Sequence, residues 1–106
     1  MSGPRELREL PYEARARIAD NLFLRRLRAE YSHADLSKRA MLSQSRIKRL
    51  EDGEIGGQLD TYVRLAGALG VTVADLLAGV RWTPAAIERD VQAGYEVVFE
   101  VENGDN

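Results

Sequence analysis

The stretch ADLSKRAMLSQSRIKRLEDG, residues 34–53, decides the fold of this chain. Its pattern predicts two short helices joined by a tight turn. Leu36 and Ala40 are four residues apart and therefore share one face of the first helix. Ile47 and Leu50 form the matching apolar pair on the second helix. The two apolar faces can close over each other, and the remaining surface of the second helix is left to solvent.

The second of these helices is expected from Gln44 to Glu51. Ser43 precedes it as an N-cap, because its hydroxyl can accept a hydrogen bond from the free N–H groups of the first turn. Gly53 follows it as a left-handed cap. The side chains that point away from the apolar pair are Gln44, Ser45, Arg46, Lys48 and Arg49. A rigid helix with this polar and basic surface suits the edges of bases in a DNA major groove.

Three more helices are expected around this pair. One runs from about Tyr12 to Glu30, with Ile18 and Leu22 on its core face. Another runs from Leu59 to Leu69, and a short one follows Thr72. The inward positions expected for the helix over 59–69 are Leu59, Tyr62 or Val63, Ala66 and Leu69.

Five segments in this order resemble the Cro/CI-type helix-turn-helix repressors of phages and bacteria. The resemblance covers about residues 18–79, with the segments LRRLRAEYS, LSKRA, SQSRIKRLEDG, LDTYVRLAGALGV and TVADLL. It implies a mainly α, five-helix, lambda-repressor-like DNA-binding domain at residues 12–79. It also implies a sequence-specific transcriptional regulator, most often a dimeric repressor that inserts its recognition helix into the major groove of a palindromic operator.

The resemblance assigns roles to individual residues. Arg26 falls on a core face, where an unpaired charge would be costly, and in the resembling family an arginine here pairs with the glutamate that corresponds to Glu51. Contacts to bases fall to Gln44, Ser45 and Arg49, with Arg46 and Lys48 as candidates for bases or phosphates. Contacts to phosphates fall to Arg25, His33, Lys38 and Ser43.

Two positions depart from the family pattern. His33 stands where a glutamine usually bonds to a DNA phosphate. An imidazole N–H can make the same contact, but a solvent-exposed histidine at a helix start explains the residue equally well. Met41 stands where the turn often has glycine, which predicts a less strained turn.

Composition limits the other function classes. The formal net charge of −2 is polarised: residues 1–52 carry 12 Lys and Arg against 8 Asp and Glu, or +4, and residues 53–106 carry 3 against 9, or −6. There are no cysteines and one histidine, so we expect no metal, no cofactor and no enzymatic activity. Without an apolar run long enough for a membrane span or a signal-peptide pattern, we expect a cytoplasmic protein.

Residues 1–11 are interpreted as a charged N-terminal arm, and residues 80–106 as an extension beyond the family fold. Thr83 and Pro84 predict a helix start, with the helix ending near Ala93. The alternation in YEVVFEV then predicts a single β-strand, over residues 95–101, with no partner in its own sequence.

An unpaired strand must find a partner, so we expect homodimerisation through this segment. The residues assigned to dimerisation are Tyr95, Val97, Val98, Phe99 and Val101, with Leu24, Leu27, Trp82, Ile87 and Val91 as added apolar contacts. The rival is a monomer in which the strand folds back on its own N-terminal segment. An alternative function is an antitoxin, whose acidic C-terminal half would bind a partner toxin while the protein autoregulates its operon.

Overall fold

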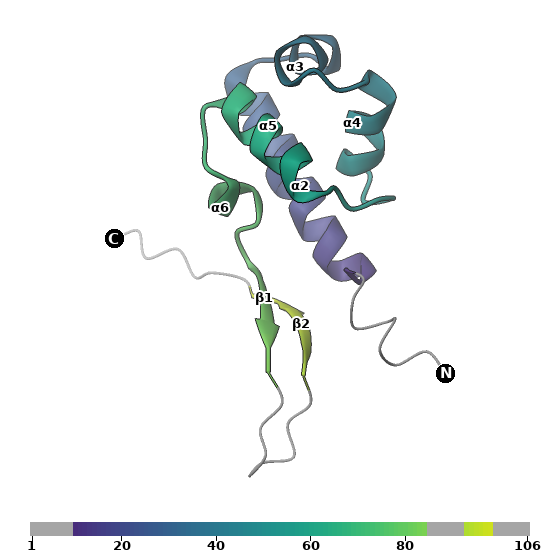
Figure 1. The fold of residues 1–106 in the computed structure, drawn as a ribbon, viewed down its shortest axis with the longest axis vertical. Helices are drawn as coiled ribbons and strands as arrows, with labels where there is room; N and C mark the ends of the chain where they lie inside the picture. Colours follow the sequence, from purple (N-terminus) through teal and green to yellow (C-terminus); the bar gives the residue numbers. More distant parts are fainter. Residues whose placement is uncertain (1–9, 85–92, 99–106) are drawn as a thin grey trace.

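The computed structural model describes residues 10–84 and 93–98 of the 106-residue chain, as five helices and two short strands (Figure 1). The mainly α fold expected from the sequence is confirmed. The helices and strands are α2 (Tyr12–Ala29), α3 (His33–Ala40), α4 (Gln44–Glu51), α5 (Leu59–Leu69), α6 (Val73–Leu76), β1 (Val80–Thr83) and β2 (Gly94–Val97). Most of the expected N-terminal arm lies outside the described residues.

Local capping signals explain where α3 and α6 begin. The Ser32 hydroxyl accepts a hydrogen bond from the backbone N–H of Asp35, and the Asp35 carboxylate accepts one from the backbone N–H of Ser32. Thr72 and Asp75 make the same reciprocal pair before α6. In each case the hydrogen bond that the aspartate carboxylate accepts from a backbone N–H lowers the pKa of that aspartate. The capping boxes satisfy backbone donors that the helices cannot satisfy themselves.

The core lies where α2, α3, α4, α5 and α6 converge. Its buried members are Ile18, Leu22, Leu36, Ala40, Ile47, Leu50, Tyr62, Leu65, Ala66 and Leu76. The expected inward position of Leu59 is wrong, because its side chain is 70% exposed at the first turn of α5. Of the alternatives Tyr62 and Val63, Tyr62 is buried, and its hydroxyl accepts a hydrogen bond from the backbone N–H of Gly57.

The expectation of one unpartnered strand is wrong. β1 and β2 form an antiparallel pair with Val80 opposite Val97 and Trp82 opposite Tyr95. The Trp82 and Tyr95 rings meet edge to face at 5.1 Å between centroids. The partner strand was missed because the sequence VRWT is only four residues long and ends at a proline that also fits a helix start. The helix expected from Pro84 to Ala93 falls mainly on residues 85–92, outside the described part of the chain.

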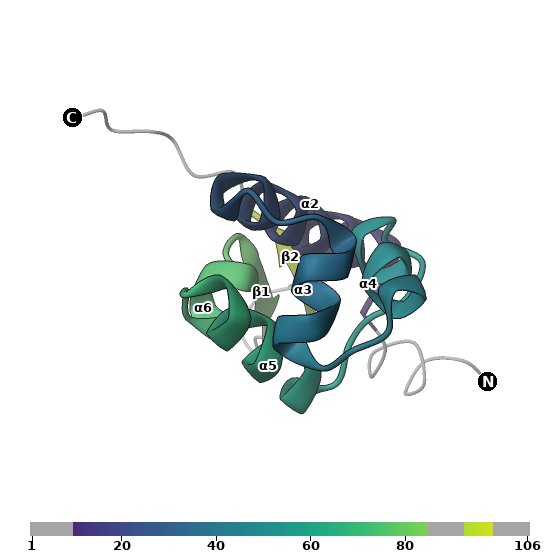
Figure 2. The same ribbon diagram turned by 90° about the horizontal axis from the view of Figure 1, so that it is seen from above.

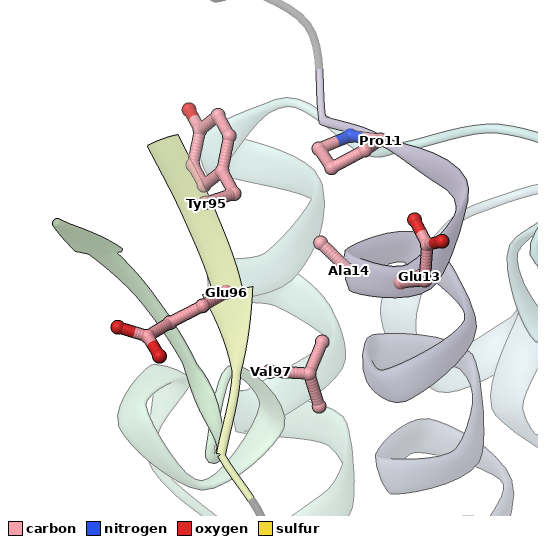
Figure 3. A pocket seen from close by; sticks show the side chains of 6 residues that line it. All are labelled: Pro11, Glu13, Ala14, Tyr95, Glu96 and Val97. Carbon is pink, nitrogen blue, oxygen red and sulfur yellow. The ribbon is translucent and has the colours of Figure 1, made fainter. Parts of the chain in front are cut away.

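The strand pair also packs against the N-terminal half of α2. Figure 3 shows Val97 pointing toward α2 and Glu96 pointing away from it. An open hollow of about 420 Å³ lies between β2 and the start of α2. On the outer face, Arg81 donates a hydrogen bond of 2.9 Å to Glu96. β2 therefore contacts its own chain on both sides, through β1 and through α2.

Candidate nucleic-acid interface

The helix-turn-helix pair is formed by α3 and α4. Ser43 caps α4 by accepting a hydrogen bond from the backbone N–H of Arg46. After the helix, Gly53 takes a left-handed conformation with φ of +74°. Seen from above, α4 and α6 lie on opposite sides of α3 (Figure 2). In this view α3 therefore lies between α4 and α6.

The ion pair expected between Arg26 and Glu51 is present, and it ties α2 to the end of α4. Arg26 Nε donates to Glu51 Oε2 at 2.7 Å, and Nη2 donates to Oε1 at 2.9 Å. Both side chains are nearly buried, with 9% and 6% of their surface exposed. The hydrogen bonds that Arg26 donates to the Glu51 carboxylate raise the pKa of Arg26 above its ordinary value. Such a bidentate ion pair fixes the distance and orientation of α4 relative to α2.

His33 joins this ion pair. Its Nε2 lies 3.1 Å from Glu51 Oε1, and 30% of its side chain is exposed. The first residue of α3 is thereby bonded to the last residue of α4. Sequence spacing had not indicated this contact, because it depends on how the two helices cross.

Four of the five residues expected at bases are exposed on α4: Gln44, Ser45, Lys48 and Arg49. Arg49 Nε is 3.4 Å from Glu54 Oε1, but both side chains are 57% exposed. Solvent screening makes such a pair weak, so the guanidinium is available for another ligand.

Arg46 is placed differently from the other four residues. Its side chain is half-buried, and Nη2 lies 3.5 Å from the hydroxyl oxygen of Thr61 on α5. Its Nε is buried without a partner among the described residues. The structure therefore turns Arg46 toward α5, where it packs beside the N-terminal part of that helix rather than beside Gln44 and Ser45.

The residues expected at phosphates are not all brought together. Lys38 is exposed on α3, and the Ser43 hydroxyl is engaged as the cap of α4. Arg25 instead faces α6, where its Nη2 lies 3.7 Å from Asp75 Oδ1. Arg25 is therefore turned toward α6, and α6 lies on the far side of α3 from α4 (Figure 2).

Two arginines that the sequence analysis does not single out make contacts around α3. Arg64 on α5 donates a hydrogen bond of 3.1 Å to the Met41 carbonyl. Arg39 lies over the Tyr31 ring, with its central carbon 4.5 Å from the ring centroid. Only the tertiary fold reveals the first contact, since 23 residues separate its two partners.

The described residues contain no cluster of three or more His, Cys, Asp or Glu side chains that could hold a metal ion. No helix among them is long and apolar enough to cross a membrane.

A family profile described as a helix-turn-helix domain matches residues 17–79, which is more than half of the chain. The chain belongs to this helix-turn-helix family. The crystal structure of a hypothetical transcription factor, NHTF, from Neisseria is similar to the chain, with a TM-score of 0.58 and 26% sequence identity. The similarity covers 65% of this chain and 80% of that one. A comparison with curated proteins gives no significant match.

These similarities confirm the broad assignment to a helix-turn-helix fold of the DNA-binding kind. They do not distinguish the Cro/CI-type group from other helix-turn-helix proteins, so membership of that group stays a prediction.

Proposed function

We propose that this protein is a sequence-specific DNA-binding transcriptional regulator whose α4 enters the major groove. The observation that carries the proposal is the surface of α4. Gln44, Ser45, Lys48 and Arg49 are exposed on a helix that the ion pair of Arg26 and Glu51 holds in place. A rigid support matters because direct readout of bases depends on hydrogen bonds with defined geometry.

The chemistry of these side chains suggests how readout would work. Arginine can bond to the O6 and N7 atoms of guanine, and glutamine to the N6 and N7 atoms of adenine. We assign base contacts to Gln44, Ser45 and Arg49, and either bases or phosphates to Lys48. Lys38 is assigned to phosphates, which position the protein without reading sequence. The surplus of basic residues in residues 1–52 provides local attraction to the DNA backbone, despite the negative net charge.

We further propose that the regulator is a dimeric repressor with a palindromic operator, acting in the cytoplasm. A single helix-turn-helix contacts few base pairs, and a genome offers many competing sites. A twofold dimer places two recognition helices about one DNA turn apart, roughly 34 Å. Among the described residues, Leu24 and Leu27 of α2 and Trp82 of β1 expose apolar side chains that are available for pairing.

The experiment that tests this function is selection of binding sites from a random DNA pool, followed by sequencing. We expect one enriched motif with two related half-sites and at least one G in each. The matched control is the double variant Gln44→Ala and Arg49→Ala, which should still fold because both side chains are exposed but should enrich no motif. Selection of no motif by the wild-type chain would refute sequence-specific binding.

The antitoxin alternative has less support from the structure. It relied on an exposed strand in the acidic half of the chain. β2 is instead paired with β1 in the same chain and packed against α2. The two assignments also differ in a measurable way, because an antitoxin needs a partner protein for its activity and a regulator of the kind proposed here does not.

A further inference from the structure

We propose that His33 is a proton-gated phosphate contact, in which only the doubly protonated imidazolium bridges Glu51 and a DNA phosphate. The inference rests on the proposed DNA-binding function and concerns the regulation of that same interface. It follows from the hydrogen-bonding chemistry of a single imidazole ring.

The first step concerns the proton on Nε2. A carboxylate can only accept hydrogen bonds, and Glu51 Oε1 lies 3.1 Å from His33 Nε2. Nε2 must therefore carry a proton in this contact. A neutral imidazole has one N–H group, so when that group is bonded to Glu51 the other nitrogen, Nδ1, has no proton to donate.

The second step concerns the accessibility of Nδ1. Within the described part of the chain, the contact with Glu51 is the only hydrogen bond that the His33 ring makes. The one buried side-chain nitrogen or oxygen found there without a partner is Arg46 Nε. Nδ1 of His33 has no partner among the described residues and is not one of their buried, unpartnered atoms, so it reaches solvent.

The third step concerns position. In a helix-turn-helix complex the second helix occupies the major groove and the first helix crosses the phosphate backbone. His33 is the first residue of α3, and its ring contacts the end of α4. A surface hollow beside it is also lined by the exposed Lys48 of α4. His33 thus lies at the flank of the recognition helix, where the backbone bordering the groove would pass.

The fourth step concerns charge. The charged groups that line the hollow around His33 are Asp20 and Arg26 from α2, and Lys48, Glu51 and Asp52 from α4. Asp35, on the same helix as His33, is committed to the capping box. The formal charges of these five groups sum to −1 when His33 is neutral, and this net negative charge repels a phosphate. A proton on Nδ1 brings the sum to zero and adds a charged donor that faces solvent.

When His33 is neutral and its one proton is on Nε2, Nδ1 presents a lone pair to the phosphate and the contact is repulsive. In the protonated state, Nε2–H bonds to Glu51 while Nδ1–H bonds to the phosphate. Binding of DNA is then coupled to uptake of one proton. Histidine is the side chain whose unperturbed charge change falls between pH 5 and 8, which makes it the residue type suited to such coupling.

The test measures the affinity of the full chain for its selected operator duplex at pH 6.0 and pH 8.0 and constant ionic strength. We expect about fivefold to tenfold tighter binding at pH 6.0, the gain from one charge-assisted hydrogen bond. His33→Gln should bind with the same affinity at both pH values, because an amide N–H donates at either. Lys48→Ala is the matched control from the same hollow, and it should weaken binding while keeping the wild-type pH dependence.

A second measurement does not depend on a variant. His33 is the only histidine in the chain, so its ring resonances in an NMR titration are unambiguous. We expect Nδ1 of the DNA-bound ring to carry a proton, so that nitrogen-15 correlation spectra of the complex show N–H signals from both ring nitrogens. A DNA-bound ring that carries a single N–H, or equal affinity at both pH values, overturns the gate while leaving the DNA-binding function intact. Absence of operator binding at either pH overturns the proposed function and the gate together.

Discussion

Glu51 connects three helices through one carboxylate. It accepts two hydrogen bonds from Arg26 on α2 and one from His33 on α3, while it ends α4. The carboxylate is nearly buried, so its charge is compensated by these donors rather than by water. Any change at Glu51 therefore acts on the placement of the recognition helix as well as on stability.

Removal of one member of the buried ion pair should destabilise the fold strongly. Arg26→Met leaves the Glu51 carboxylate buried without its main partner, and we expect a loss of about 3–5 kcal/mol in the free energy of unfolding. The double variant Arg26→Met and Glu51→Leu should recover most of that loss, because no charge then remains buried. Denaturant unfolding followed by circular dichroism measures both effects.

The control for this prediction is the exposed pair of Arg81 and Glu96, which has a similar distance of 2.9 Å. Arg81→Met should cost only about 0–1 kcal/mol, because solvent screens the charges. Equal losses for Arg26→Met and Arg81→Met would show that the pair of Arg26 and Glu51 is not protected from water.

Base readout and phosphate contact should respond differently to single substitutions. Arg49→Ala should cost about 1–3 kcal/mol on the operator and relax the preference at one base position. Lys38→Ala should weaken binding to operator and random DNA alike and should reduce the dependence of affinity on salt. Fluorescence anisotropy with both duplexes over a range of salt concentrations separates these outcomes. A uniform loss for Arg49→Ala would assign it to the backbone instead.

The turn between α3 and α4 is strained, contrary to the expectation drawn from the sequence. Met41 adopts a left-handed conformation with φ of 58° and is 79% exposed. Its backbone is held by hydrogen bonds from Arg64 to the Met41 carbonyl and from the Met41 N–H to the Ser37 carbonyl. The methionine in place of glycine predicts a less strained turn, but the conformation that Met41 adopts is the one that glycine adopts most easily.

Met41→Gly should therefore stabilise the protein. The gain is about 1 kcal/mol, because relief of the left-handed strain exceeds the entropy lost from the more flexible unfolded chain. For a domain of this size, that gain in the free energy of unfolding corresponds to a rise of about 4–8 °C in the melting temperature. Differential scanning calorimetry measures the melting temperature.

The reciprocal control is Gly70→Ala at the end of α5. Gly70 has φ of +71°, and a Cβ added there would meet no atom within 4 Å. The substitution should lower the melting temperature, since its cost is purely conformational. A Met41→Gly variant that melts at or below the wild-type temperature would contradict this account of the turn.

Elements with local signals could be predicted from the sequence, and contacts between distant residues could not. Ser43 and Gly53 marked the correct limits of α4, because a cap acts within one helical turn. Helical periodicity placed Leu59 inward, but the core stops short of the first turn of α5. The bond between His33 and Glu51 joins residues that only the crossing of α3 and α4 brings together.

The strand pair shows the same limit. The alternation in residues 95–101 marked a strand, but nothing local to it indicated which segment would be its partner. In the chain as folded, β1 supplies that partner. The structural reason for pairing β2 between two molecules is therefore removed, although dimerisation itself stays a prediction.

At the scale of the whole molecule, apolar surface remains uncovered on α2. Phe23, Leu24 and Leu27 are 42%, 47% and 49% exposed, on one side of the longest helix. Residues three and four positions apart on a helix are neighbours, so the three side chains form one patch. Contiguous apolar surface of this kind marks interaction sites more often than isolated exposed residues do.

We predict that the protein is a homodimer in solution and that Leu24 and Leu27 are covered in it. The double variant Leu24→Ser and Leu27→Ser should be a folded monomer by light scattering. It should also lose operator affinity, because each half-site then binds separately. Val63→Ser, on the 52% exposed Val63 of α5, is the matched control and should stay dimeric.

Deletion of residues 95–106 tests the C-terminal segment as the alternative interface. A deletion variant that becomes monomeric while the leucine variant stays dimeric would place the interface in the C-terminal segment. A wild-type mass of one chain at micromolar concentration would refute dimerisation through either surface.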